Sequence, residues 1–140
     1  MIKEILAISG KAGLYKLISR GANMLIVETI DSNHKRMPAY AADKVVSIAD
    51  ISIYTDDGED TPLVNVFQSI SDQNEGKVVD LNHRKASNEE IIDFFKKALP
   101  NYDPDRVRQS DMRKVLSWYN ILAEAGINKF VEEESEKENA

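Results

Sequence analysis

The sequence lacks cysteine altogether and contains no long apolar run. Disulfide scaffolds, cysteine-ligated zinc and thiol catalysis all require a sulfhydryl group, so these three classes are excluded. A helix that crosses a bilayer needs roughly 20 consecutive apolar residues, and no stretch of the chain approaches that length. The apolar patch at the N-terminus is interrupted by Lys3 and Glu4 and lacks the pattern of a secretion signal. We therefore expect a cytoplasmic protein without membrane contact.

Positive charge is the scarcer kind. The 140 residues hold 18 Lys and Arg against 24 Asp and Glu, which gives a net charge of −6. Residues 132–138 (EEESEKE) carry five Glu and one Lys and account for −4 of it. This segment has almost nothing apolar to bury, which predicts an acidic disordered tail over residues 127–140. The negative total also disfavours indiscriminate nucleic-acid binding, which needs a basic surface.

Short β-prone segments fill the first 58 residues, at 14–19, 24–30, 35–41, 44–49 and 51–55. The first two are joined by a link containing Gly and Asn, which predicts a hairpin. Pro38 restricts the third strand to a sheet edge or a bulge, because proline cannot donate to a ladder. A short helical turn is expected near Ala42–Val46. The pattern predicts an α+β protein in which residues 1–58 form a small antiparallel SH3/Sm-like barrel or curled sheet.

After residue 58 the hydrophobic period becomes that of a helix. Residues 59–86 predict a helix that begins at Thr61 and Pro62, followed by a polar linker. One face of this helix is apolar and consists of Leu63, Val66, Phe67 and Ile70.

A helical unit is expected over residues 87–126. Its first helix has a capping box at Ser87 and Glu90 and stops at Pro100. A short helical turn is predicted over 104–108. The last helix is expected to begin at Ser110 and to end at Gly126.

No sequence motif for catalysis or metal binding is present. Residues 9–13 (SGKAG) resemble a phosphate-binding loop, but the glycine required five residues before Gly10 is missing and alanine follows Lys11. His34 and His83 have no partner at the spacing of a metal site. The carboxylates at 56, 57, 59 and 60 do not follow the pattern of a calcium-binding loop, so a solvated acidic loop is expected. We expect no metal, no cofactor and no enzymatic activity.

Basic and aromatic residues occur on and beside the expected hairpin and again before the last helix. The candidate binding residues are Lys11, Tyr15, Lys16, Arg20, Lys35, Arg36, Arg106 and Arg108. Small barrels hold single-stranded nucleic acid with such side chains, through stacking on bases and contacts to phosphates. The alternative is that they are the outward positions of half-exposed strands and helix ends. Residues 1–70 carry seven basic and nine acidic side chains, which favours that alternative unless the fold sorts the charges by face.

Several spaced segments resemble an uncharacterised bacterial family of short proteins that is defined only as a domain of unknown function. These segments are residues 5–11 (ILAISGK), 13–17 (GLYKL), 53–57 (IYTDD), 99–103 (LPNYD), 106–107, 110–111 and 118–120 (WYN). The resemblance covers about residues 2–126. It implies no activity, cofactor or catalytic residue.

The residues together favour a non-catalytic interaction module that binds a protein partner or associates with itself. The acidic body, the missing site chemistry and the edge strand at Pro38 are the reasons. The alternative is a module that binds RNA or single-stranded DNA through the basic and aromatic first hairpin. A third alternative, an enzyme whose site is assembled only by the fold, would require a deep pocket lined by convergent polar groups.

Overall fold

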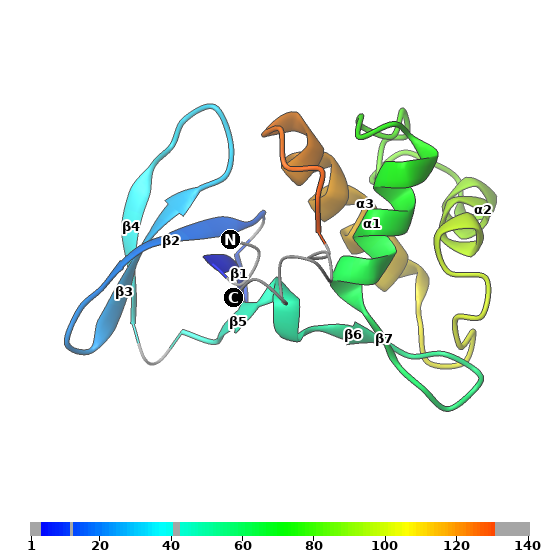
Figure 1. Ribbon diagram of the computed structural model, residues 1–140, viewed down its shortest axis with the longest axis horizontal. Helices are drawn as coiled ribbons and strands as arrows, with labels where there is room; N and C mark the ends of the chain where they lie inside the picture. The colour runs from blue at the N-terminus through cyan, green and yellow to red at the C-terminus, as the bar shows by residue number, and fades with distance from the viewer. Residues whose placement is uncertain (1–3, 12, 41–42, 131–140) are drawn as a thin grey trace, which may run out of the picture.

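The computed structural model describes residues 4–11, 13–40 and 43–130. Within these ranges, short strands in the N-terminal half precede three α-helices (Figure 1), which confirms the α+β class. The strands are β1 (Ile5–Ile8), β2 (Tyr15–Arg20), β3 (Met24–Thr29), β4 (Arg36–Tyr40), β5 (Val45–Ser47), β6 (Ser52–Ile53) and β7 (Thr61–Pro62). The helices are α1 (Leu63–Gln73), α2 (Asn88–Ala98) and α3 (Gln109–Glu124).

Five strands form one antiparallel sheet in the order β4-β3-β2-β1-β5. The predicted β2–β3 hairpin is present, with a register shift between Leu17 and Ser19. The strand that contains Pro38, β4, lies at one edge of the sheet, as the sequence predicted. The other edge is β5, and the two edges are not paired within the described residues, so a closed barrel is not confirmed. The sequence did not predict β1, although it lies between β2 and β5.

The helical turn expected near Ala42–Val46 is wrong. In the described part of this segment, Val45 and Val46 belong to β5 and pair with β1, as suits β-branched residues. The turn comes later, as the 3-10 turn η2 (Ile48–Asp50), because the Ser47 side chain accepts a hydrogen bond from the backbone N–H of Ala49. After η2, the short strands β6 and β7 pair with each other and lead into α1.

The ends of the helices differ in part from the prediction. The capping box at Ser87 and Glu90 is confirmed, and Gly126 follows the last helix with a φ of 81°. However, Thr61 belongs to β7 and α1 begins after Pro62. The last helix begins before Ser110, because Asp111 accepts a hydrogen bond from the backbone N–H of Arg108 at 3.0 Å and so fixes the start there.

The segment 104–108 contains the predicted turn: the backbone N–H groups of Arg106 and Val107 donate to the carbonyl of Asp103 at 3.2 and 2.9 Å. Asp103 organises it by accepting hydrogen bonds from the backbone N–H of Asp105 and from the guanidinium Nε of Arg106, both at 2.9 Å. These side-chain contacts stabilise the turn at its first residue.

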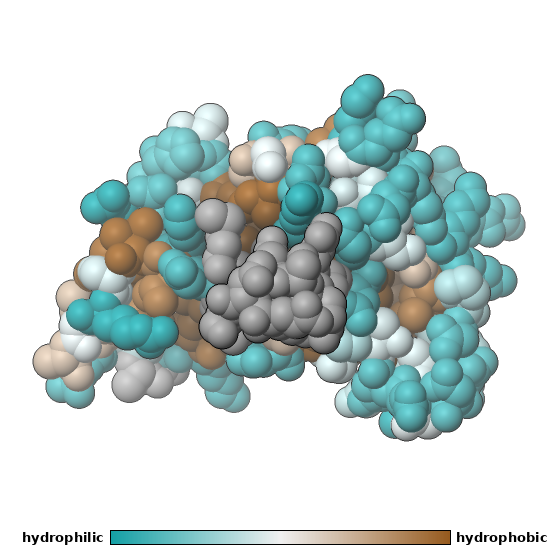
Figure 2. Space-filling view, viewed as in Figure 1, coloured by the Kyte–Doolittle hydropathy of each residue, from teal (hydrophilic) through white to brown (hydrophobic). Residues whose placement is uncertain are grey.

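The main core lies among the three helices and the β1 side of the sheet. Ile5 and Leu14 reach this core from the sheet, and the predicted apolar face of α1 is fully buried in it. A smaller cluster lies on the opposite face of the sheet. It consists of Leu6, Ile8, Tyr15, Val27 and Ala39. The hairpin strands β2 to β4 extend away from the helices (Figure 1), and on the face seen in Figure 2 apolar surface gathers over the sheet.

The predicted tail does not begin at residue 127. Phe130 is 3% exposed, and its ring centroid lies 5.4 Å from that of Phe67 and 6.2 Å from that of Tyr119. Its backbone N–H donates to the Gln68 side chain. Residues 127–130 therefore belong to the fold, and residues 131–140 lie outside the described part of the chain.

The linker between α1 and α2 has no regular secondary structure, yet it is held against α3 by side chains. The Tyr119 hydroxyl donates to the carbonyl of Lys77 at 2.6 Å, and the Asn120 amide exchanges two hydrogen bonds with the backbone of Val79. Arg113 donates to the carbonyl of His83 at 2.9 Å. The linker is thereby fixed beside α3. None of the helices in the described ranges is long and apolar enough to cross a membrane.

Candidate anion-binding groove

A groove of about 740 Å³ lies between the sheet and the outer face of α3. One wall is the end of β1 with the loop that follows it and part of β5. The other wall is the N-terminal half of α3, and the linker closes one side through His83 and Arg84. On α3 the lining positions are Ser110, Arg113, Lys114, Ser117 and Trp118, which recur at the spacing of one helix face.

The charge of this groove is of one sign. Its lining includes the basic side chains of Lys11, Lys44, Arg84, Arg113 and Lys114. No Asp or Glu is among the described residues that line it. None of the five side chains lies within ion-pair distance of a carboxylate in the described part of the protein. Although the chain has a net charge of −6, its described part therefore places five basic side chains without an ion-pair partner in one groove.

Local structure positions these cations. Gly10 and Gly13 both have φ values of 81°, a conformation that residues with a Cβ adopt at a cost, and Lys11 lines the groove from the loop that contains them. The Lys11 ammonium also donates to the sulfur of Met37 on β4, at 3.8 Å. Arg113 is held by two hydrogen bonds of 2.9 Å, to the carbonyl of His83 and to the side chain of Asn88. Lys114 lies with its ammonium 5.7 Å from the centre of the Trp118 ring.

The pKa of His83 depends on its burial and on the charges around it. Burial, together with the nearby positive charges of Arg84 and Arg113, lowers the pKa of the His83 imidazole below its usual value. Burial is the larger cause of the shift, and the two neighbouring charges act in the same direction because like charges disfavour a further proton.

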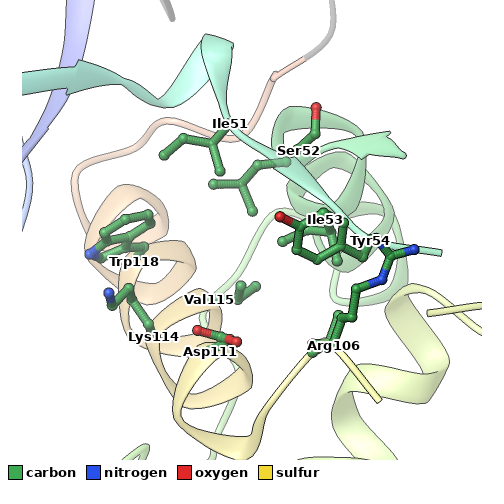
Figure 3. Close-up of a pocket in the computed structure, with 11 residues that line it drawn as sticks. Ile51, Ser52, Ile53, Tyr54, Arg106, Asp111, Lys114, Val115 and Trp118 are labelled. Carbon is green, nitrogen blue, oxygen red and sulfur yellow. The ribbon is translucent and has the colours of Figure 1, made fainter. Parts of the chain in front are cut away.

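A smaller hollow of about 270 Å³ continues the groove along α3 (Figure 3). The two share Ile51, Lys114 and Trp118 in their linings. In Figure 3, Tyr54 and Arg106 lie on one side of the hollow, Trp118 and Lys114 on the other, and Asp111 and Val115 project from α3 between them. The guanidinium carbon of Arg106 lies 4.5 Å from the centre of the Tyr54 ring.

The structure distributes the eight candidate residues over several surfaces. Lys11 lies in the groove and Arg106 at the hollow. Lys16 and Arg36 flank Glu28 in the cross-strand register, and Arg36 forms an ion pair with it at 3.1 Å.

The remaining candidates add no second basic patch. Arg20 is paired with Leu25 and lines an opening beside Leu17, whereas Lys35 is exposed next to β4. Arg108 is exposed at the start of α3. Tyr15 is only 6% exposed, so the expectation that its ring stacks on a base is wrong: it packs with Val27 in the smaller core.

Four basic residues of the groove were not candidates: Lys44, Arg84, Arg113 and Lys114. In the sequence, Arg113 and Lys114 are part of a run that mixes Arg and Asp, which indicates surface ion pairs. The helical spacing of Arg113, Lys114, Ser117 and Trp118 is a signal that they share a face. Nothing local in the sequence indicates that the β1 loop lies opposite that face.

In the acidic loop at residues 56–60, Asp57 makes hydrogen bonds within the protein. The Asp57 carboxylate accepts hydrogen bonds from the Thr55 hydroxyl at 2.6 Å, from the backbone N–H of Glu59 at 3.0 Å and from the Asn101 amide at 2.9 Å. These bonds, that from Thr55 first, hold the pKa of Asp57 below its usual value. Among the described residues there is no group of three or more side chains arranged to hold a metal ion.

We expect Asp57→Asn to destabilise the protein at pH 7 and to do so less in acid. The lowered pKa of Asp57 means that its stabilisation is present above the unfolded value near 3.8 and is lost as the pH falls through the folded value. Denaturant unfolding of both proteins at pH 7 and at about pH 2.5 measures the difference. A difference that stays the same at both pH values would contradict a role for the charge.

Comparisons with known proteins agree with the resemblance seen in the sequence. Residues 2–48 match a domain of unknown function, DUF5606, and residues 51–122 match a second one, DUF6852. A solution NMR structure of a Bacteroides vulgatus protein from a structural genomics consortium is 54% identical. The match covers 94% of this chain and 92% of that one, with a TM-score of 0.75. No curated protein shows significant similarity. The chain belongs to a bacterial family in which DUF5606 is followed by DUF6852.

Proposed function

We propose that this protein is a non-catalytic binding module that holds single-stranded nucleic acid in the groove between the β1 loop and α3. The observation that carries the proposal is the set of five Lys and Arg side chains without a lining Asp or Glu. Phosphate contacts from Lys and Arg supply most of the affinity of sequence-independent nucleic-acid binding. Among the described residues, the side chains of Lys44 and Arg84 make no hydrogen bond, so they are free to pair with phosphates.

Two aromatic rings favour a nucleic acid over a simple anion. Trp118 is half-buried in the groove, and Tyr54, at the adjoining hollow, is 45% exposed. Single-stranded nucleic acids bind where bases stack on aromatic side chains beside a basic track. Each ring already lies next to a cation, Lys114 and Arg106 respectively, so a stacked base would meet a phosphate-binding group at both places.

The non-catalytic part of the proposal rests on the kinds of ionisable groups in the groove. The described residues that line the groove include five Lys and Arg side chains and one histidine, and no carboxylate that could act as a general base beside them. Such a set attracts and orients an anion.

A protein partner remains the alternative occupant, provided that it presents an acidic segment to the same groove. Self-association through the sheet has less support. Pro38 blunts the β4 edge and the β5 edge has only three residues, which are two devices that limit strand addition. We also propose that the sheet is an opened SH3-like barrel, because β5 returns beside β1 and the smaller core lines one face.

To test this proposal, the binding of labelled single-stranded RNA and DNA of mixed sequence is measured by fluorescence anisotropy over a range of salt concentrations. We expect binding at low salt and a slope of log K against log[salt] of about −2 to −3.5, which corresponds to roughly three to five phosphate contacts. Bound phosphate should also raise the pKa of His83, because its negative charge offsets the positive charges of Arg84 and Arg113. NMR titration measures this pKa.

Two results would count against nucleic-acid binding. One is the absence of binding to any oligonucleotide at low salt. The other is capture of poly-glutamate but not of oligonucleotides, which would assign the groove to an acidic protein segment.

A further inference from the structure

The hollow beside the groove has the size of a subsite. Its volume of about 270 Å³ lies below the roughly 300–1,000 Å³ of pockets that enclose a whole small molecule. It opens into the larger groove through the shared residues Ile51, Lys114 and Trp118. A ligand that lies along the groove can therefore place one part of itself in the hollow.

The walls of the hollow suit a flat ring. The apolar lining consists of Ile51, Ile53, Leu63, Val107, Val115 and the Trp118 ring, and Tyr54 adds a second aromatic ring. Three charged side chains are placed around this apolar surface: Arg106, Asp111 and Lys114. This combination fits a planar group with apolar faces and a polar edge, such as a nucleobase turned out of the stack.

Asp111 supplies the feature that can choose among bases. One carboxylate oxygen, Oδ2, accepts the backbone N–H of Arg108 at 3.0 Å. Within the described residues the other oxygen, Oδ1, accepts no hydrogen bond. A carboxylate only accepts, so Asp111 favours a base edge that presents N–H donors.

We infer that the hollow is a base subsite that prefers guanine, an inference that rests on the proposed nucleic-acid binding of the groove. Guanine presents two neighbouring donors, N1–H and the N2 amino group, which match the two oxygens of a carboxylate. Its O6 acceptor lies next to these donors, where Lys114 or Arg106 can donate to it. Adenine, cytosine and uracil each present a single donor position on the corresponding edge, so they match a carboxylate less well.

The preference can be measured with oligouridine strands that carry one central guanine, adenine, cytosine or abasic position. For the wild-type protein we expect the guanine strand to bind about tenfold more tightly than the abasic strand, in line with one good bidentate base contact. Equal affinity for all four strands would overturn the base subsite while leaving binding in the groove intact. A preference for adenine or cytosine would overturn the assignment to guanine. If no strand binds, the proposed function itself fails.

Asp111→Asn is the matched variant. The asparagine carbonyl can still accept the backbone N–H of Arg108, so the start of α3 is preserved, but its amide now offers donors to the base. We expect the guanine preference to fall below about twofold while binding of the abasic strand stays the same or strengthens, because a negative charge is removed. Tyr54→Ala should weaken the strands that carry the central base more than it weakens the abasic strand. A guanine preference that survives Asp111→Asn unchanged would exclude Asp111 as the discriminating group.

Discussion

Replacement of Phe130 by alanine is expected to lower the free energy of unfolding by about 3–5 kcal/mol. The side chain is 3% exposed and packs between the rings of Phe67 and Tyr119, so its loss leaves a cavity among large aromatic groups that cannot close over it. The backbone N–H of Phe130 is bonded to Gln68, which limits how far the segment can shift to fill the space. Urea unfolding, followed by circular dichroism and by Trp118 fluorescence, gives the difference directly.

Val78→Ala is the control for this measurement. Val78 is 43% exposed on the linker, so the same kind of truncation should change stability by no more than about 0.5 kcal/mol. If Phe130→Ala were as mild as Val78→Ala, the C-terminal segment would not be part of the core. A large loss of stability supports the packing seen in the structure, whereas a small loss supports the sequence-based expectation of a tail that starts at residue 127.

Phe130 also illustrates why some of the fold was predictable and some was not. Among the signals that act within a few residues, those for helix starts at Thr61 and Ser110 were wrong. Three others are confirmed: the capping box at Ser87 and Glu90, the edge position of Pro38 and the glycine after α3. Each depends on backbone geometry that the residue itself imposes. Phe130 lies two residues before an acidic run, and its burial depends on helices α1 and α3, which are distant in the sequence.

In the sheet and the groove, too, local features were predictable, whereas features that depend on distant parts of the chain were not. The β2–β3 hairpin is local and was predicted, whereas β1 has only four residues and is recognised as a strand only through its partners β2 and β5. The groove combines residues from four separated parts of the chain: the β1 loop, β5, the linker and α3. The net charge of the sequence adds these basic residues to the acidic ones elsewhere, so a negative net charge does not show whether the fold has a basic surface.

Charge reversal within the groove is expected to have the largest effect on binding. In the double variant Lys44→Glu with Arg84→Glu, two of the proposed contacts to phosphate are replaced by repulsion. Like charges placed against each other cost several kcal/mol, so we expect the affinity for single-stranded RNA at low salt to fall by a factor on the order of 100. The side chains of both residues are exposed and make no hydrogen bond within the described part of the chain, so the fold should be preserved. Anisotropy titrations give the affinities, and thermal melting checks the fold.

The hairpin offers a control with the same change in charge. Arg20→Glu with Lys35→Glu also replaces two exposed basic residues, so both variants change the net charge from −6 by −4. If only the total charge governed binding, the two variants would lose affinity equally. If the groove binds the strand, the hairpin variant should lose less than about threefold, because neither side chain lines the groove and salt screens charges that do not contact the strand. A larger loss in the hairpin variant would favour the first hairpin as the binding surface. Because Arg20 lies beside Leu25 and Lys35 lies outside the groove lining, the structure favours the larger loss for Lys44 and Arg84.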